Sequence, residues 1–269
     1  MLRLHIKTNG DWTAKLRQLP SDIEVGINGP FGAPAQRFYE FRHSLIIGAG
    51  IGITPFSAIL ADLQYKNDAK YGGPWQQDGD DNASDAMIWP QSRHSEPELP
   101  AKDFRRTDFH WIVRDGNSLT WLSDLLNKVF VSQRWHRDHD ENSHLDIRIN
   151  TYITSKRHRI ATHILAWLLE SSRTEERPIS MLTGLLNPTS FGRPDFDEIL
   201  DKHYEEMRKV KTKSKETGSS SKDHDIVGVF YCGAPAIGEI LADKCEELTM
   251  RGSTDKSKIK YRFMKEVFG

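Results

Sequence analysis

The chain has 269 residues, of which 37% are hydrophobic, and its formal net charge of −1 excludes a global basic field that would recruit nucleic acid. Its two cysteines, Cys232 and Cys245, lack the spacing of a metal site and are too few for a disulfide scaffold, which favours a reducing compartment. The sequence contains neither a signal peptide nor an apolar stretch of about twenty residues, so we expect no membrane span within it.

At the N-terminal end, residues 2–8 alternate apolar and polar side chains, which is the pattern of a half-buried strand. A turn signal follows at residues 9–11, and Trp12 and Leu16 resume the apolar pattern. Because a domain seldom begins in a finished strand, we interpret this start as a cut through something larger.

The stretch 44–56 indicates a pyrophosphate site. An uncharged run of Leu and Ile predicts a buried strand, and glycines follow it at the alternate positions 48, 50 and 52. Glycines let the backbone approach phosphates, and the N–H groups of a helix start face the anion. Thr54 suits the N-cap of that helix, and Pro55 suits its first position. The motif alone is weak, because Ile53 stands where a G-x-G-x-x-G motif has its third glycine.

Downstream of this stretch, strand and helix patterns alternate. Buried strands are predicted at 45–47, 109–113, 145–153 and 226–231. Helices are predicted at 55–65, 119–130, 160–169, 196–210 and 236–248. This alternation predicts an α/β fold, in which helices cover both faces of a parallel sheet and a ligand lies at the carboxyl ends of the strands.

Two segments interrupt the alternation. Residues 67–106 are rich in Asp, Asn, Gly, Pro and Ser, and we interpret them as a mobile surface insertion. Residues 209–225 combine a lysine-rich run with Gly and Ser. Such a run is usually a solvated loop, and phosphoregulation or lipid contact is the alternative.

Three further motifs would lie at the carboxyl edge of the sheet. Arg114 ends one predicted strand, and Arg193 lies in a loop between Gly and Pro. Two arginines at one edge suggest an extra phosphate, the group that distinguishes NADPH from NADH. The alternative is that Arg114 pairs with Asp115 or with a surface carboxylate. Cys232 ends the last predicted strand, where it is either a buried structural thiol or a ligand contact.

In this order, these residues resemble the cytosolic dehydrogenase region of the NADPH oxidases, within the wider ferredoxin-reductase-like group. The resemblance implies a C-terminal remnant of a flavin-binding β-barrel with an inter-subdomain link at 1–34. It implies an NADPH-binding domain at 35–269, with mobile insertions near 67–106 and 209–225. The nucleotide loop would be 48–55. The family's upstream His-Pro-Phe-Thr-type flavin motif and its haem-bearing membrane helices are absent from this sequence.

The resemblance also assigns nucleotide contacts. The NADPH pyrophosphate would be held by Gly50, Gly52, Ile53, Thr54 and Pro55. The 2′-phosphate would be bound by Arg114 and Arg193, whose neighbours Asp115 and Pro194 belong to the same cofactor-binding set. Thr154 would lie further along the nucleotide. Cys232 and Gly233 would lie beside the nicotinamide.

For the flavin, the resemblance implies that His5, Ile6 and Lys7 contact FAD and that Phe268 stacks on the isoalloxazine as a gate. Phe268 and Cys232 are the residues expected to act in catalysis, and no metal ligand is expected. Gly269 follows the aromatic residue that closes the chain in this family.

The implied reaction is hydride transfer from NADPH to FAD, with electrons passing singly through haem to oxygen. A ferric reductase of the same superfamily is one alternative, and a catalytically silent regulatory docking module is another. The implied partners are the upstream FAD barrel and transmembrane haem domain of the same protein, a regulatory protein or calcium-sensing domain, and no nucleic acid. The implied location is the cytosolic face of a membrane.

Overall fold

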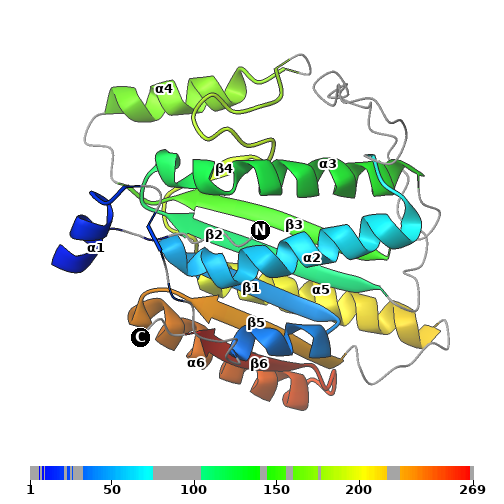
Figure 1. Cartoon of the computed structure of the whole chain (residues 1–269). Helices are drawn as coiled ribbons and strands as arrows, with labels where there is room; N and C mark the ends of the chain where they lie inside the picture. The colour runs from blue at the N-terminus through cyan, green and yellow to red at the C-terminus, as the bar shows by residue number, and fades with distance from the viewer. Residues whose placement is uncertain are drawn as a thin grey trace.

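The computed structural model describes residues 6, 8, 10–20, 23–24, 26, 33–74, 104–139, 144–155, 160–174, 177–216 and 225–266. Their strands form one six-stranded parallel sheet in the order β4-β3-β2-β1-β5-β6 (Figure 1). In chain order the strands are β1 (His43–Ala49), β2 (Arg105–Val113), β3 (Leu145–Ile153), β4 (Thr189–Phe191), β5 (Ile226–Cys232) and β6 (Lys260–Glu266). The predicted α/β class with a parallel sheet is confirmed.

Helices cover both faces of this sheet. In Figure 1, α2 (Thr54–Tyr71) and α3 (Ser123–His139) lie in front of it, and α5 (Phe196–Glu216) and α6 (Pro235–Thr254) lie behind it. The remaining helices are the short α1 (Asp11–Leu16), α4 (Ile160–Ser171) and the 3₁₀ turns η1 (Pro34–Glu40), η2 (Gly50–Ile53) and η3 (Gly116–Trp121). No helix in the described part of the chain combines the length and apolar character needed to cross a bilayer.

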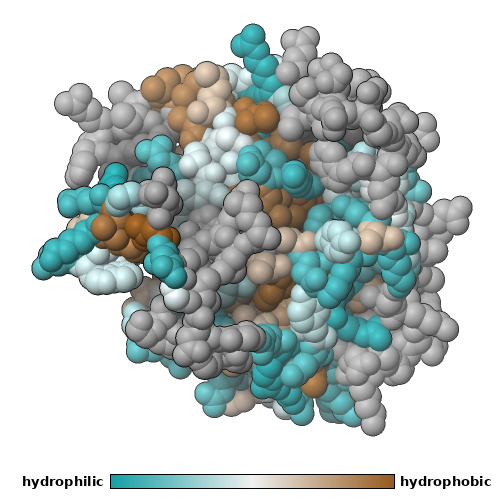
Figure 2. All heavy atoms as spheres, in the orientation of Figure 1, coloured by the Kyte–Doolittle hydropathy of each residue, from teal (hydrophilic) through white to brown (hydrophobic). Residues whose placement is uncertain are grey.

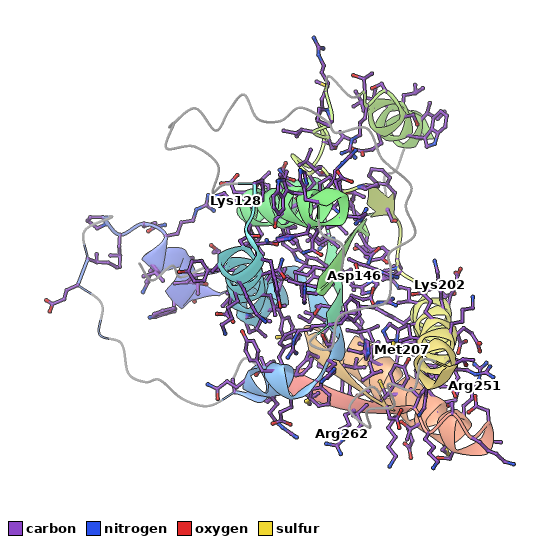
Figure 3. All side chains as sticks on the ribbon, turned by 90° about the vertical axis from the view of Figure 1, so that its right-hand side faces the viewer. Lys128, Asp146, Lys202, Met207, Arg251 and Arg262 are labelled. Atoms are coloured by element: carbon purple, nitrogen blue, oxygen red, sulfur yellow. The ribbon has the colours of Figure 1, made fainter. Side chains whose placement is uncertain are left out.

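Each face of the sheet has its own apolar core. Ile46 of β1 belongs to the front core, with Phe56 of α2 and Leu126 of α3. Leu45 belongs to the back core, which also contains Met207 of α5. Figure 3 shows Met207 pointing toward the sheet and Lys202 of the same helix pointing outward. Because alternate side chains of a strand face opposite sides, uncharged strands such as 45–47 are needed to fill both cores.

The strand order reverses at β1. The chain leaves β1 through α2 to reach β2 on one side, whereas β5 returns to pair with the other side of β1. Where two connections run away from each other in this way, open α/β sheets bind ligands in a crevice at the carboxyl ends of the strands, here β1 and β5. The expected position of the ligand is therefore between these two strands.

Two strands were not predicted, β4 and β6. β4 has only three residues, and β6 reads Lys-Tyr-Arg-Phe-Met-Lys-Glu with most side chains partly exposed. Both lie at the edges of the sheet. Edge strands are short or charged in many proteins, so their patterns carry little apolar signal.

The predicted bounds of the two insertions are wrong. Helix α2 continues past Tyr65 to Tyr71, and β2 begins at Arg105, so the segment 67–106 includes parts of two regular elements. Asp68 looks like a loop residue, but its Oδ1 accepts hydrogen bonds from Gln64 (2.7 Å) and from Ser132 of α3 (2.7 Å). Polar residues in this helix therefore join α2 to α3. Helix α5 likewise extends to Glu216, into the predicted loop 209–225.

The predicted N-terminal strand is not supported where it can be observed. Of residues 2–8, the structure describes Ile6 and Thr8; neither is in a strand, and Ile6 is 54% exposed. Trp12 and Leu16 lie in helix α1, which has no buried residue. An alternating pattern forms a stable strand only when a neighbouring strand and a core receive it.

Helix α4 has an exposed apolar face. Its side chains Ile164, Leu165, Trp167 and Leu168 are each at least 50% exposed. Glu170 of the same helix is instead partly buried, where it accepts a hydrogen bond from Ser180 and pairs with Arg173. Figure 2 shows the corresponding hydrophobic atoms gathered over α4.

Candidate nucleotide-binding site

The carboxyl ends of β1 and β5 bring two distant motifs together. Gly48 of β1 pairs with Cys232 of β5, although the residues are far apart in sequence. After Ala49 the chain enters η2 and then α2, and after Cys232 it turns at Gly233 into α6. The glycine loop and the Cys-Gly turn thus lie side by side at the expected ligand position.

Ile53, at the position of the missing third glycine, is a core residue. Its side chain is 1% exposed. A Cβ on Gly48 would lie 2.4 Å from Cδ1 of Ile53 and 2.9 Å from its Cα. The close packing that a third glycine supplies in the common motif is supplied here by Gly48, which leaves room for Ile53. The predicted contact of Ile53 with pyrophosphate therefore depends on its backbone, because its side chain faces the core.

Gly52 and Gly50 make close backbone approaches possible. A Cβ on Gly52 would lie 2.3 Å from the carbonyl oxygen of Cys232, far inside van der Waals contact. Gly50 has a φ of 59°, a left-handed conformation that glycine adopts at little cost. These two positions require glycine for different reasons, one steric and one conformational.

The side chain of Trp111 in β2 is hydrogen-bonded to the glycine loop. Its indole is fully buried, and Nε1–H donates a hydrogen bond to the carbonyl oxygen of Gly50 at 3.0 Å. A buried indole needs a partner for its single donor. No sequence motif marked Trp111 for this role, and the signal that could have found it is a tryptophan two residues before the end of a buried strand.

Thr54 is not the N-cap of α2, contrary to the prediction. It is the first residue of the helix; its hydroxyl donates to the carbonyl oxygen of Ile51 at 2.7 Å, and the N-cap is Ile53 without a side-chain cap. The reason is that η2 runs directly into α2, so the chain is already helical at Thr54. Pro55 is therefore the second residue of the helix rather than the predicted first, and it still lies in the first turn.

Cys232 is buried and protonated. Its side chain is 1% exposed, and burial, together with the carboxylate of Glu266, raises the pKa of the thiol to about 11. At neutral pH this group is therefore a neutral thiol rather than a nucleophilic thiolate. Glu266, which the sequence did not reveal, also accepts a hydrogen bond from the N–H of Ala35 at 2.6 Å.

Gly233 brings the β5 loop against the β1 loop. Its φ is 157°, and a Cβ there would lie 2.5 Å from Cβ of Ala49. The buried Tyr231 hydroxyl donates to the carbonyl oxygen of Ala234 at 2.7 Å, which holds the turn into α6. A side chain at position 233 would therefore collide with Ala49 of the β1 loop.

Backbone hydrogen bonds join the ends of β2, β3 and β4. Thr154 N–H donates to Val113 O (2.9 Å), Ser155 N–H to Arg114 O (2.8 Å) and Gly192 N–H to Ile153 O (2.9 Å). Arg114 and Arg193 are both exposed at this common edge. The Thr154 hydroxyl also donates to Val113 O at 3.0 Å. The structure therefore brings Arg114, Thr154 and Arg193 to one side of the crevice.

Asp115 and Pro194 have local structural roles at the same edge. The Asp115 carboxylate accepts from the N–H of Ser118 at 3.3 Å and caps η3. Among the described residues it makes no ion pair with Arg114, so that alternative for Arg114 is not borne out. Pro194 is partly buried and precedes Asp195, which caps α5. Contact of Asp115 and Pro194 with a nucleotide stays a prediction.

Of the four expected flavin contacts, the structure describes Ile6. Ile6 is exposed, and His5, Lys7 and Phe268 lie outside the described residues. Across the part of the chain that the structure describes, no cluster of His, Cys, Asp or Glu could hold a metal ion.

Comparison with known proteins agrees with this geometry. Residues 41–246 match the family described as "Ferric reductase NAD binding domain". Similar proteins include probable respiratory burst oxidase homolog protein I of Arabidopsis thaliana (25% identical, 99% of this chain, 29% of the relative). NADPH oxidase 1 of Rattus norvegicus is 26% identical over 98% of this chain and 38% of the relative. NADPH oxidase 5 of Homo sapiens is 29% identical over 86% of this chain and 26% of the relative. The chain thus spans well under half of each relative.

Proposed function

Because this chain belongs to the family of ferric reductase NAD-binding domains, we propose that it binds NADPH as the dehydrogenase part of an NADPH oxidase. The observation that carries the proposal is the meeting of the glycine loop with Cys232-Gly233 at the carboxyl ends of β1 and β5. Three relatives are named as NADPH oxidases or a respiratory burst oxidase homologue, which supports this choice within the family.

The glycine loop fits a pyrophosphate. Residues 44–56 carry no charged side chain, so nothing in the loop repels an anion. Gly50 and Gly52 leave the backbone uncovered, and α2, an 18-residue helix, begins at Thr54 with Pro55 in its first turn. Backbone N–H groups and the positive end of the helix dipole would together bind the phosphates.

Arg114 and Arg193 fit the 2′-phosphate that distinguishes NADPH. They follow β2 and β4, which lie two strand spacings apart, about 10 Å. Both side chains are exposed and long enough to meet over β3. Guanidinium groups bind phosphate through paired donors, so the two residues would act as a clamp.

At the nicotinamide end, the chain's own residues would orient the ring. Bound NADPH supplies a hydride, for which FAD is the proposed acceptor before haem and oxygen. Hydride transfer needs alignment more than it needs an acid or a base. The thiol of Cys232 and the bare backbone of Gly233 would orient the ring without themselves carrying a charge.

The remaining parts of the proposal concern the whole protein. FAD would bind where residues 5–7 and Phe268 meet an upstream flavin barrel, with the haem domain in a membrane and this domain on its cytosolic side. A regulatory protein or a calcium-sensing domain is a further proposed partner. The exposed apolar face of α4 supports contact with another domain, because monomeric domains rarely leave such a patch uncovered.

Calorimetric titration of the purified chain with NADPH and, separately, NADH tests the proposal. We expect tenfold or tighter binding of NADPH, about 1.4 kcal/mol. Binding of neither nucleotide, even after the upstream flavin barrel and FAD are added, would contradict the proposal and favour a silent docking module. Equal binding of both would contradict the 2′-phosphate clamp.

A ferric reductase is the second candidate, because the description of the matching family names that activity. The two candidates differ in the terminal electron acceptor, which is oxygen for an oxidase and ferric iron for a reductase. The full-length protein, supplied with NADPH, should reduce oxygen to superoxide when no ferric chelate is added. Turnover only when a ferric chelate is present would favour the reductase.

A further inference from the structure

We propose that Trp111 is a positioning residue for the pyrophosphate, acting through the Gly50–Ile51 peptide. This inference rests on the proposed function. The indole Nε1 of Trp111 lies 3.0 Å from the carbonyl oxygen of Gly50, and the indole itself is fully buried. Gly50 and Ile51 are partly exposed, so the peptide bridges the core and the crevice.

The physical argument is the geometry of one peptide group. In a trans peptide the C=O and N–H point in opposite directions. Since Trp111 draws the Gly50 carbonyl into the core, the N–H of Ile51 is directed outward, toward the side where the phosphates would lie. Glycine adopts the φ of 59° at Gly50 at little cost. In this conformation the Gly50 carbonyl oxygen accepts the hydrogen bond from the buried indole, which helps to fix the orientation of the peptide.

The first test compares Trp111→Phe with wild type. The variant keeps an apolar ring and loses the N–H donor. We expect the affinity for NADPH and for NADH to fall by the same factor, about tenfold. By contrast, 2′-AMP, which has the 2′-phosphate and no pyrophosphate, should bind the variant as it binds wild type. Unchanged NADPH affinity, or an equal loss for 2′-AMP, would overturn the proposal.

Phe109→Leu is the matched control. Phe109 is fully buried, lies two residues earlier on the same face of β2 and belongs to the same core as Trp111. Its side chain has no hydrogen-bond donor, so it cannot replace the bond from Trp111 to the loop. It should lower the melting temperature without changing NADPH affinity. If it weakens NADPH as much as Trp111→Phe does, the effect is one of core packing and the proposal fails.

A measurement on the wild-type chain keeps the proposal testable if Trp111→Phe does not fold. In the ¹⁵N-labelled chain, added inorganic pyrophosphate should shift the Ile51 amide, while the amide of Leu60 in α2 stays in place. Movement of other amides in 48–55 without Ile51 would overturn the positioning role. If wild type binds no nucleotide even with the upstream flavin barrel and FAD added, the proposed function itself has failed, and that result is distinguishable from a failure of Trp111 alone.

Discussion

Gly52 and Cys232 touch through their backbones: a Cβ on Gly52 would lie 2.3 Å from the carbonyl oxygen of Cys232 and 3.2 Å from its Sγ. This contact joins the loop after β1 to the end of β5 across the floor of the crevice. Because Gly52 has no side chain, the loop that would bind the pyrophosphate can lie directly against the end of β5, where the nicotinamide would bind.

Gly52→Ala should damage both stability and binding. The new methyl group meets backbone atoms, which cannot rotate away, so we expect a loss of about 1–3 kcal/mol in the free energy of unfolding. NADPH affinity should fall by tenfold or more because the two loops are forced apart. Chemical denaturation and calorimetry measure the two effects. Gly26→Ala is the control, since nothing lies within 4 Å of its Cβ position; equal effects of both variants would refute the argument.

Arg193→Ala should weaken NADPH and leave NADH nearly unchanged. A charge-assisted hydrogen bond is worth about 1.5–3 kcal/mol, so the expected loss for NADPH is ~10- to 100-fold. Arg251→Ala removes a guanidinium that pairs with Asp201 and Glu205 between α5 and α6, near the opposite end of α6 from the crevice. That control should change neither affinity. An equal loss of both nucleotides in Arg193→Ala would rule out a 2′-phosphate contact.

Cys232 should be inert at neutral pH and costly to ionise. Burial, with the nearby Glu266 carboxylate, raises the pKa of its thiol from 9.0 to about 11. A raised folded-state pKa means that the stabilising contribution is complete below pH 9 and is lost as the pH rises toward 11. The unfolding free energy should therefore decline over this range, and less steeply in Cys232→Ser. Rapid reaction of the native thiol with a disulfide reagent at pH 8 would contradict this account.

Asp68 should contribute to acid stability by joining α2 to α3. Burial alone would raise its pKa, but hydrogen bonds from His136, Ser132 and Gln64 lower it below 3.8. A lowered pKa gives stability that is present above the unfolded pKa and is lost as the pH falls through the folded value. Asp68→Asn should lose about 1–3 kcal/mol at pH 7 and show a shallower decline below pH 4.

The control for Asp68 is the exposed Asp124 in the first turn of α3. At pH 7, Asp124→Asn should lower the free energy of unfolding far less than Asp68→Asn does, apart from a small helix-dipole effect at the N-terminus. The test fails for Asp68 if Asp68→Asn shows the same acid profile as wild type in thermal unfolding from pH 7 to pH 3.

The errors of sequence interpretation in this chain have physical causes. The strand predicted at 2–8 and the N-cap predicted at Thr54 were both inferred from local patterns. Ile6 is exposed and, like Thr8, lies outside any strand of the described residues, and η2 makes the chain helical before Thr54. Asn67 was assigned to a loop because it is polar, yet it is buried in α2. In each case the position of the residue in the folded chain, and not its local sequence pattern, determined its conformation.

The sequence by itself determined the α/β alternation, the parallel sheet and the place of the glycine loop, because strand and helix periodicity and glycine spacing are local properties. Only the tertiary structure decided that Ile53 packs over Gly48, that Gly52 meets Cys232 and that Trp111 holds Gly50. These contacts join residues brought together by the register of β1 with β2 and β5. Register depends on long-range pairing, which a local pattern does not encode.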